Sequence, residues 1–193
     1  MRAAARPARS RWRSVSVAGL LSIAAQVHAA GAAVVLPPPP EVSTAVGEAR
    51  LQGRGTMRFF GLPVYEARLW AAADFDPRRY EAHAFALELE YARKLGGTAI
   101  AQRSIAEMRR AGDFDEGQAQ SWQAALVRAF PDVAPGDRLT GVRLTGGATR
   151  FFHNGRPTST VEDPAFARLF FGIWLAATTS EPGLRRQLIG PGS

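Results

Sequence analysis

Alternating apolar and polar residues predict several β-strands in this chain. From Phe85 to Tyr91 every second residue is apolar, so these side chains share one strand face, while Glu88 and Glu90 lie on the other face, which we expect to be solvated. A turn signal at Asn154-Gly155 predicts a two-residue hairpin. With such turns as boundaries, strands are predicted over 49–57, 62–72, 84–91, 137–144, 149–153 and 156–161.

Apolar residues three or four positions apart predict helices elsewhere. Ala119, Trp122 and Leu126 fall on one helical face, so we expect Trp122 to lie in the core. Asp163 followed by Pro164 is typical of a helix N-terminus, and the helix after it is apolar on more than one face, which indicates a buried helix. Helices are predicted from a cap at Thr98 to 111, and over 116–130, 165–177 and 182–190.

The order of these elements predicts the fold class. Strands come first, then two helices, then more strands, then two helices. Strands grouped with strands favour an antiparallel sheet packed around helices, which is an α+β domain. About 160 residues remain after the N-terminal segment, the size of one domain with a core large enough to fold without disulfides.

The N-terminal segment has the layout of a secretory signal peptide. Five arginines precede a short apolar run from Val15 to Ala25, and small residues surround a cleavage position after Ala29. We therefore predict a signal peptide over 1–29, a proline-rich spacer over 30–41, a single domain over 42–190, and a periplasmic or secreted protein. The apolar run is short for a membrane span, so no transmembrane segment is expected after removal of the signal; an uncleaved amphipathic anchor is the alternative.

Charge and residue types narrow the chemistry. The chain has 24 basic and 17 acidic residues, and removing the five arginines of the signal leaves 19 against 17, so the high net charge is no reason to expect nucleic-acid binding. The absence of cysteine excludes disulfides and thiolate catalysis. His83 and His153 lack metal-ligand spacing, so we predict no metal and no cofactor. The pairs Arg93-Lys94, Arg109-Arg110 and Arg185-Arg186 are interpreted as solvated faces, or as a docking surface for an acidic partner.

A set of motifs in fixed order carries a family resemblance. Gly53 and Gly55 precede F-F-G-L-P-V-Y-E-A-R-L-W, and L-E-Y, G-D-R-L, F-F-H-N-G, D-P-A-F-A and I-W-L-A follow, beginning at Leu89, Gly136, Phe151, Asp163 and Ile173. Over most of residues 42–190 the chain resembles the chalcone isomerase-like domain of exported bacterial proteins.

The resemblance implies a fold and two functions. The family fold is an open-faced β-sandwich, an antiparallel sheet around a long helix, with a ligand cleft between sheet and helices. Enzymes of the family close a flavonoid ring by adding a phenolate oxygen to an enone, using an arginine after the G-x-G motif and a threonine before the V-Y. Related members without this activity bind fatty acids. Here Met57 and Phe60 occupy the arginine and threonine positions, and methionine donates no hydrogen bond.

We therefore expect a non-catalytic protein that binds a small apolar or amphipathic ligand, such as a fatty acid, with no catalytic residue assigned. The predicted ligand-binding residues are Met57, Arg58, Phe60, Tyr65 and Tyr91. Arg58 can replace the missing arginine only if a β-bulge turns it inward.

Two alternatives remain open. One is isomerase or lyase activity on a flavonoid-like or enone substrate, using Arg58, Tyr65 or Tyr91. The other is an envelope protein-interaction module whose partner the sequence does not identify. In that case Phe59, Phe60, Tyr65 and Trp70 pack a filled core instead of lining a cleft.

Overall fold

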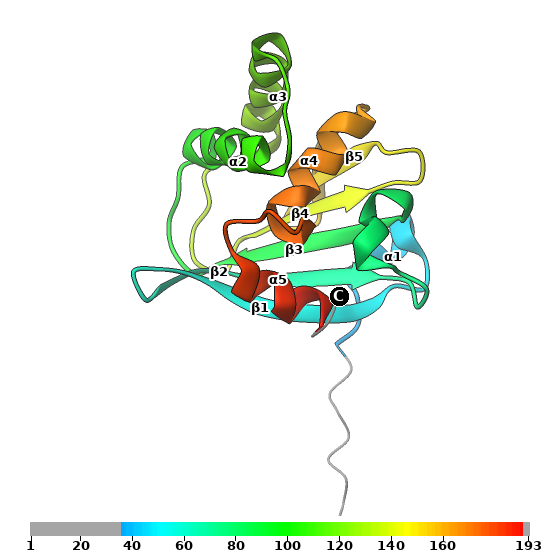
Figure 1. Cartoon of the computed structure of the whole chain (residues 1–193). Helices are drawn as coiled ribbons and strands as arrows, with labels where there is room; N and C mark the ends of the chain where they lie inside the picture. Colours follow the sequence, from blue (N-terminus) through cyan, green and yellow to red (C-terminus); the bar gives the residue numbers. More distant parts are fainter. Residues whose placement is uncertain (1–35, 191–193) are drawn as a thin grey trace, which may run out of the picture. The chain divides into compact units, whose positions relative to one another are not determined.

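The computed structural model describes residues 36–190, and its core is one six-stranded antiparallel sheet (Figure 1). The predicted signal peptide and residues 30–35 of the predicted spacer lie outside the described residues. The strands pair in chain order, from β1 at one edge to β6 at the other. They are β1 (Arg50–Phe59), β2 (Leu62–Ala71), β3 (Phe85–Tyr91), β4 (Arg138–Arg143), β5 (Thr149–His153) and β6 (Arg156–Val161). The predicted α+β class with an antiparallel sheet is confirmed.

The helices lie before, between and after the strands in the chain. The predicted helices appear as α2 (Gly97–Ala111), α3 (Glu116–Ala129), α4 (Pro164–Leu175) and α5 (Pro182–Ile189). Two elements were not predicted: α1 (Pro40–Val46) and the 3₁₀ helix η1 (Pro77–Ala82). Helix α1 begins at the last residue of the proline run, because a proline in the first helical turn removes no intrahelical hydrogen bond.

Two-residue turns close the hairpins at the ends of the sheet. Asn154 and Gly155 have φ values of 50° and 79°, as a type I′ hairpin turn requires, which confirms the predicted hairpin. Phe60 and Gly61 adopt nearly the same values, 48° and 79°, between β1 and β2. The pairing register shifts in three places, which leaves Gln52 in β1, Val64 in β2 and Thr158 in β6 as extra residues.

The main core lies between one face of the sheet and helices α2 to α5. Phe85, Leu87, Leu89 and Tyr91 point to this inner face, as their alternation predicts. Helix α4 is buried on several sides and contacts α2, which explains its nearly continuous apolar sequence. Trp122 of α3 is buried here too, confirming its predicted place in the core.

The outer face of the sheet carries a smaller core under α1. Val42 of that helix packs with Trp70, Ala86, Val142 and Phe152 from the strands.

One prediction fails on this outer face. Glu88 points outward as expected, but only 2% of the residue is exposed, so its predicted solvation is wrong. Arg68 donates to Glu88 at 2.6 Å, and Arg138 lies 3.4 Å from it, so the buried carboxylate is neutralised by two arginines from neighbouring strands. Glu90 is the partly exposed member of the pair and also bonds Arg68, at 2.8 Å.

Helix ends are fixed by carboxylates. Asp163 accepts hydrogen bonds from two backbone N–H groups at the start of α4, and its second oxygen accepts from the Trp122 indole at 2.9 Å, which joins α3 to α4. Asp115 forms a capping box with Gln118 at the start of α3. Thr98 does not cap α2. Instead Asp132, from the loop after α3, accepts from the backbone N–H of Gly97 at 2.9 Å.

The glycine pair of the first strand is explained by the last helix. Helix α5 packs on β1 so closely that a Cβ on Gly53 would collide with the Gln187 carbonyl, and one on Gly55 with the Gln187 side chain. These two glycines are therefore a packing requirement, because the backbones of strand and helix approach within contact distance.

Candidate ligand-binding site

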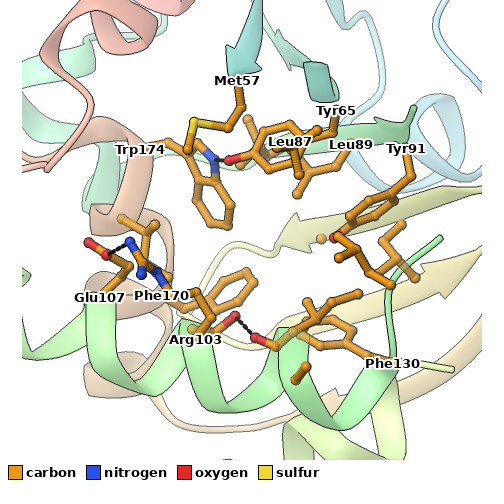
Figure 2. Close-up of a pocket in the computed structure, with 18 of the residues that line it drawn as sticks. Met57, Tyr65, Leu87, Leu89, Tyr91, Arg103, Glu107, Phe130, Phe170 and Trp174 are labelled. Atoms are coloured by element: carbon orange, nitrogen blue, oxygen red, sulfur yellow. Dashed lines mark hydrogen bonds and ion pairs between the residues drawn. The ribbon is translucent and has the colours of Figure 1, made fainter. Parts of the chain in front are cut away.

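A cavity of about 440 Å³ lies between the inner face of the sheet and helices α2 and α4. Figure 2 shows side chains of the sheet, among them Leu87, Leu89 and Tyr91, facing Phe130, Phe170 and Trp174 across this space. The volume falls within the range of small-molecule sites, which is about 300–1,000 Å³. The space beneath Phe59 is therefore open, contrary to the hypothesis of an interaction module with a filled core.

The interior of the cavity is predominantly apolar. Strands β1 to β5 supply the floor, α4 supplies the opposite wall, and residues 99–107 of α2 close one side. The apolar lining residues are Met57, Phe59, Val64, Leu87, Leu89, Leu95, Ala99, Ile100, Phe130, Leu139, Phe151, Phe170, Ile173 and Trp174. Such a lining suits an acyl chain or another extended apolar group.

Two tyrosines bring hydroxyl groups into this apolar space. Their rings meet edge to face, with centroids 5.8 Å apart, because Tyr65 and Tyr91 are cross-strand neighbours on β2 and β3. The Tyr65 hydroxyl accepts a hydrogen bond from the Trp174 indole at 3.0 Å, which leaves its own proton free to be donated. Tyr91 is only 3% exposed, and within residues 36–190 its hydroxyl has no hydrogen-bond partner.

Burial determines the charge state of both phenols. Desolvation raises the pKa of Tyr65 to about 12, and it also raises the pKa of Tyr91. Both side chains are therefore neutral at physiological pH. A phenol that stays neutral cannot act as a general base at physiological pH, but it keeps its O–H proton and can donate it in a hydrogen bond. The pair can thus donate to an acceptor group of a ligand, such as a carboxylate.

Charged residues gather at the rim of the cavity. Glu107 of α2 is buried, and its carboxylate bonds Arg103 at 2.5 Å and the Ser180 hydroxyl at 2.9 Å, with Arg110 at 3.4 Å. Arg103 is thus already paired, whereas Arg93 forms no ion pair with residues 36–190. Among the lining residues Phe59, Arg93, Ala99 and Arg103 are exposed, so we place the mouth of the cavity between them.

The predicted site residues divide into two groups. Met57, Tyr65 and Tyr91 line the cavity, and Figure 2 shows all three directed into it. Arg58 and Phe60 do not line it. Phe60 is 90% exposed at the hairpin turn, and Arg58 is exposed and donates to the Gly61 carbonyl at 3.0 Å.

The bulge that Arg58 requires is present, but on the partner strand. The register shifts between Met57 and Arg58 because Val64 of β2 is the extra residue. This irregularity leaves Met57 facing the cavity and does not turn Arg58 toward it. Trp70, a further candidate for the cleft wall, points to the outer face of the sheet.

Several lining residues were not predicted from the sequence. Arg103, Ser104 and Glu107 of α2, Arg93 after β3 and Trp174 of α4 all belong to the site. The sequence signals for them were a helical pattern that includes residues 103–107, Arg93 as one member of a basic pair, and Trp174 in the I-W-L-A motif of the predicted apolar helix. None of these signals says which side chains face the sheet.

The described part of the chain has neither a metal-binding cluster nor a membrane-spanning helix. Residues 36–190 contain no group of three His, Asp or Glu side chains arranged to hold a metal ion. In the same residues no helix has both the length and the apolar character needed to cross a bilayer. His153 lies 3.9 Å from Asp137 beside the Asn154 turn, and the Asp76 backbone N–H lies 3.4 Å from the His83 ring.

Comparisons with known proteins agree with the fold. A family model described as chalcone isomerase-like matches residues 36–190. An uncharacterized protein of Haemophilus influenzae is 30% identical over 104 residues, which are 54% of this chain and 50% of that protein, so the match spans half the relative's length. The crystal structure of an Arabidopsis thaliana fatty-acid binding protein superposes with a TM-score of 0.58 at 12% identity, over 75% of this chain and 89% of that one.

Proposed function

The chain belongs to the chalcone isomerase-like family, and we propose that it is a non-catalytic member that binds a fatty acid or a similar amphipathic carboxylate. The observation that carries the proposal is an apolar cavity with neutral phenols inside, a cation at its mouth, and Met57 where the family resemblance expects the catalytic arginine. The fold-level likeness to a protein described as fatty-acid binding supports the same ligand class.

The ligand carboxylate is assigned to the tyrosine end of the cavity. Tyr91 offers an unpartnered O–H, Tyr65 offers a second, and Arg93 lies two residues beyond Tyr91 among the lining residues at the mouth. A carboxylate accepts such hydrogen bonds readily, and a guanidinium neutralises it. The acyl chain then extends among Leu87, Leu89 and the aromatic residues of α4, where it leaves water.

The residues discussed for the alternative isomerase reaction do not supply the groups that it needs. Met57 has no N–H or O–H to donate to a carbonyl oxygen or to pair with a phenolate. Tyr65 and Tyr91 keep their protons at physiological pH, because burial raises the pKa of each phenol. The described part of the cavity therefore offers hydrogen-bond donors for holding a ligand.

Binding is tested with native mass spectrometry of the purified protein and with displacement of a fluorescent fatty acid from delipidated protein. The blocking variant is Ala99→Trp, because Ala99 is exposed at the mouth and can accept a large side chain without repacking the core. The matched control is Thr98→Trp, the exposed neighbour that does not line the cavity. We expect micromolar binding by the wild type and by the control, and weakened binding by Ala99→Trp.

Two outcomes would contradict the proposal. If no fatty acid copurifies and none binds at micromolar concentration, the ligand class is wrong. If Ala99→Trp binds as tightly as Thr98→Trp, the ligand does not enter through this mouth. Turnover of a chalcone that is lost on Tyr65→Phe would support an isomerase instead.

We also propose that the protein is exported, on the evidence of the basic and apolar segments of residues 1–29. Cell fractionation should recover it outside the cytoplasm, and intact-mass measurement should place the new N-terminus at Ala30. A full-length protein that remains in the cytoplasm would refute this part.

A further inference from the structure

The tip of the β1–β2 hairpin exposes a cluster of large apolar side chains. Phe59 is 55% exposed, Phe60 90% and Leu62 61%. The two phenyl rings contact each other edge to face, with centroids 4.5 Å apart, so the residues form one patch. Across residues 36–190 the other exposed large apolar residue is Val127, at 41%. An apolar patch concentrated on one turn indicates an interaction site, whereas a single exposed apolar residue does not.

The hairpin projects beyond the sheet. The last β2–β3 pair is Tyr65 with Tyr91, and β1 and β2 continue past it for residues 58–63. In Figure 1 the turn between β1 and β2 reaches past the neighbouring strands at that end of the sheet. The patch therefore lies on a projecting turn, where it can insert into a surface outside the molecule.

The backbone at the tip makes Phe60 unfavourable on two counts. Its φ of 48° lies in the left-handed region, which suits glycine or asparagine and is strained for a bulky residue. Its ring also stays in water. Asn154 occupies the equivalent position in the β5–β6 hairpin with a φ of 50°, and it is the residue type that this turn favours. A strained residue whose ring stays 90% exposed and contacts another exposed ring indicates a function for the patch.

Basic residues lie at the same end of the sheet. Arg58 is on the hairpin, and Arg93 and Lys94 follow directly after β3, whose loop is tied to the hairpin by the Ala92 N–H donating to the Val64 carbonyl at 2.9 Å. None of these three cations forms an ion pair within residues 36–190. The acids that line the cavity or lie beside it are Glu107, which pairs with Arg103, Asp132, which caps α2, and Glu181.

We propose that this hairpin tip docks on an anionic membrane surface. Phe59, Phe60 and Leu62 enter the interface between head groups and acyl chains, and Arg58, Arg93 and Lys94 contact the lipid head groups. Aromatic residues beside cations are the combination that interfacial binding uses. Three side chains on one turn are too small an area for a stable protein interface, which buries about 1,200–2,000 Å².

Docking goes beyond the proposed function, and it would determine from which side the ligand enters the cavity. Phe59 belongs both to the apolar patch and to the lining of the cavity, so the apolar surface continues from the tip into the mouth. A mouth held against a bilayer would let an amphipathic ligand pass without crossing water. The docking itself needs no ligand, so it can be tested whether or not a fatty acid binds.

The test is cosedimentation of the mature protein with vesicles. One set contains equimolar phosphatidylcholine and phosphatidylglycerol, and the other phosphatidylcholine alone. We expect Phe60→Asn to lower partitioning onto the anionic vesicles by about tenfold. A double variant, Arg93→Gln with Lys94→Gln, should also lower it about tenfold and reduce its dependence on salt. The control is Val127→Asn, which removes an exposed apolar side chain outside the hairpin and should leave partitioning unchanged.

The Phe60→Asn variant also keeps docking separate from ligand binding. Phe60→Asn should fold at least as stably as the wild type and bind a fatty acid in solution equally well, because Phe60 does not line the cavity. If the wild type does not bind anionic vesicles, or if Phe60→Asn binds them as well as Val127→Asn does, the proposal is wrong. A protein captured through Phe60 in the absence of vesicle binding would assign the tip to a protein partner instead.

Discussion

Replacing Tyr91 by phenylalanine should weaken ligand binding without lowering stability. The Tyr91 side chain lines the cavity, and its hydroxyl has no hydrogen-bond partner within residues 36–190. Tyr91→Phe removes no hydrogen bond within these residues, so it should change the free energy of unfolding by less than about 0.5 kcal/mol. A ligand carboxylate, by contrast, loses the hydrogen bond that this hydroxyl donates.

The loss of affinity can be estimated from the chemistry of that bond. Hydrogen bonds to charged groups contribute about 1.5–3 kcal/mol, and about 1.4 kcal/mol corresponds to a tenfold change. The Kd for a fatty acid should therefore rise about 10- to 100-fold. The measurements are urea unfolding for stability and displacement of a fluorescent fatty acid for affinity.

Another tyrosine of the chain supplies the control. Tyr80 is also buried, but its hydroxyl donates to the Arg168 carbonyl at 2.9 Å and it does not line the cavity. Tyr80→Phe should lower the free energy of unfolding by about 1 kcal/mol and leave the Kd unchanged. The reasoning is refuted if Tyr91→Phe destabilises as much as Tyr80→Phe, or if it binds the ligand with wild-type affinity.

Three further changes test the fold and its titration. Burial raises the pKa of all three tyrosines, that of Tyr65 to about 12, so the unfolded chain loses its phenolic protons near pH 10 before the folded chain does. The free energy of unfolding should therefore fall as the pH rises from 10 to 12. Tyrosinate absorbance should stay low until the protein unfolds. Gly53→Ala should cost about 1–3 kcal/mol in thermal unfolding because a Cβ meets the α5 backbone, whereas Gly183→Ala, inside α5, should not destabilise. Phe60→Asn should add about 1 kcal/mol to the free energy of unfolding in urea by relieving the positive φ, and equal stability of this variant and the wild type would contradict that expectation. Asn154→Phe at the equivalent turn should cost more than about 1 kcal/mol, because it also removes the hydrogen bonds of the Asn154 side chain with the Arg138 N–H and the Asp137 carboxylate.

The strands and the larger helices could be predicted because their periodicity is local. Alternation identified β3 and its inner face, and the Asn154-Gly155 signal identified a hairpin from two adjacent residues. Helix α1 could not be predicted in this way, since four consecutive prolines favour an extended chain and the helix is held by distant contacts: Val42 packs on the strands, and Glu41 bonds Thr140 and pairs with Arg138.

The burial of Glu88 and the composition of the cavity depend on distant contacts. Alternation correctly placed Glu88 on the outer face, but its neutralisation comes from Arg68 and Arg138, which are 20 and 50 residues away in the sequence, and helix α1, more than 40 residues away, contacts its strand. Likewise Arg103 and Glu107 belong to the site only because α2 packs beside α4 over the sheet. A single sequence does not encode which faces of separate helices meet.

The irregular pairing at both ends of the strand order has a consequence for self-association. A free edge strand can recruit a strand from a second molecule and grow into an aggregate. Edge strand β1 is interrupted by the extra Gln52 and carries Arg50, Arg54 and Arg58, all exposed. The opposite edge, β6, contains Pro157 and the extra Thr158. Charge, a missing N–H donor and a broken register thus make each edge a poor template for intermolecular strand addition.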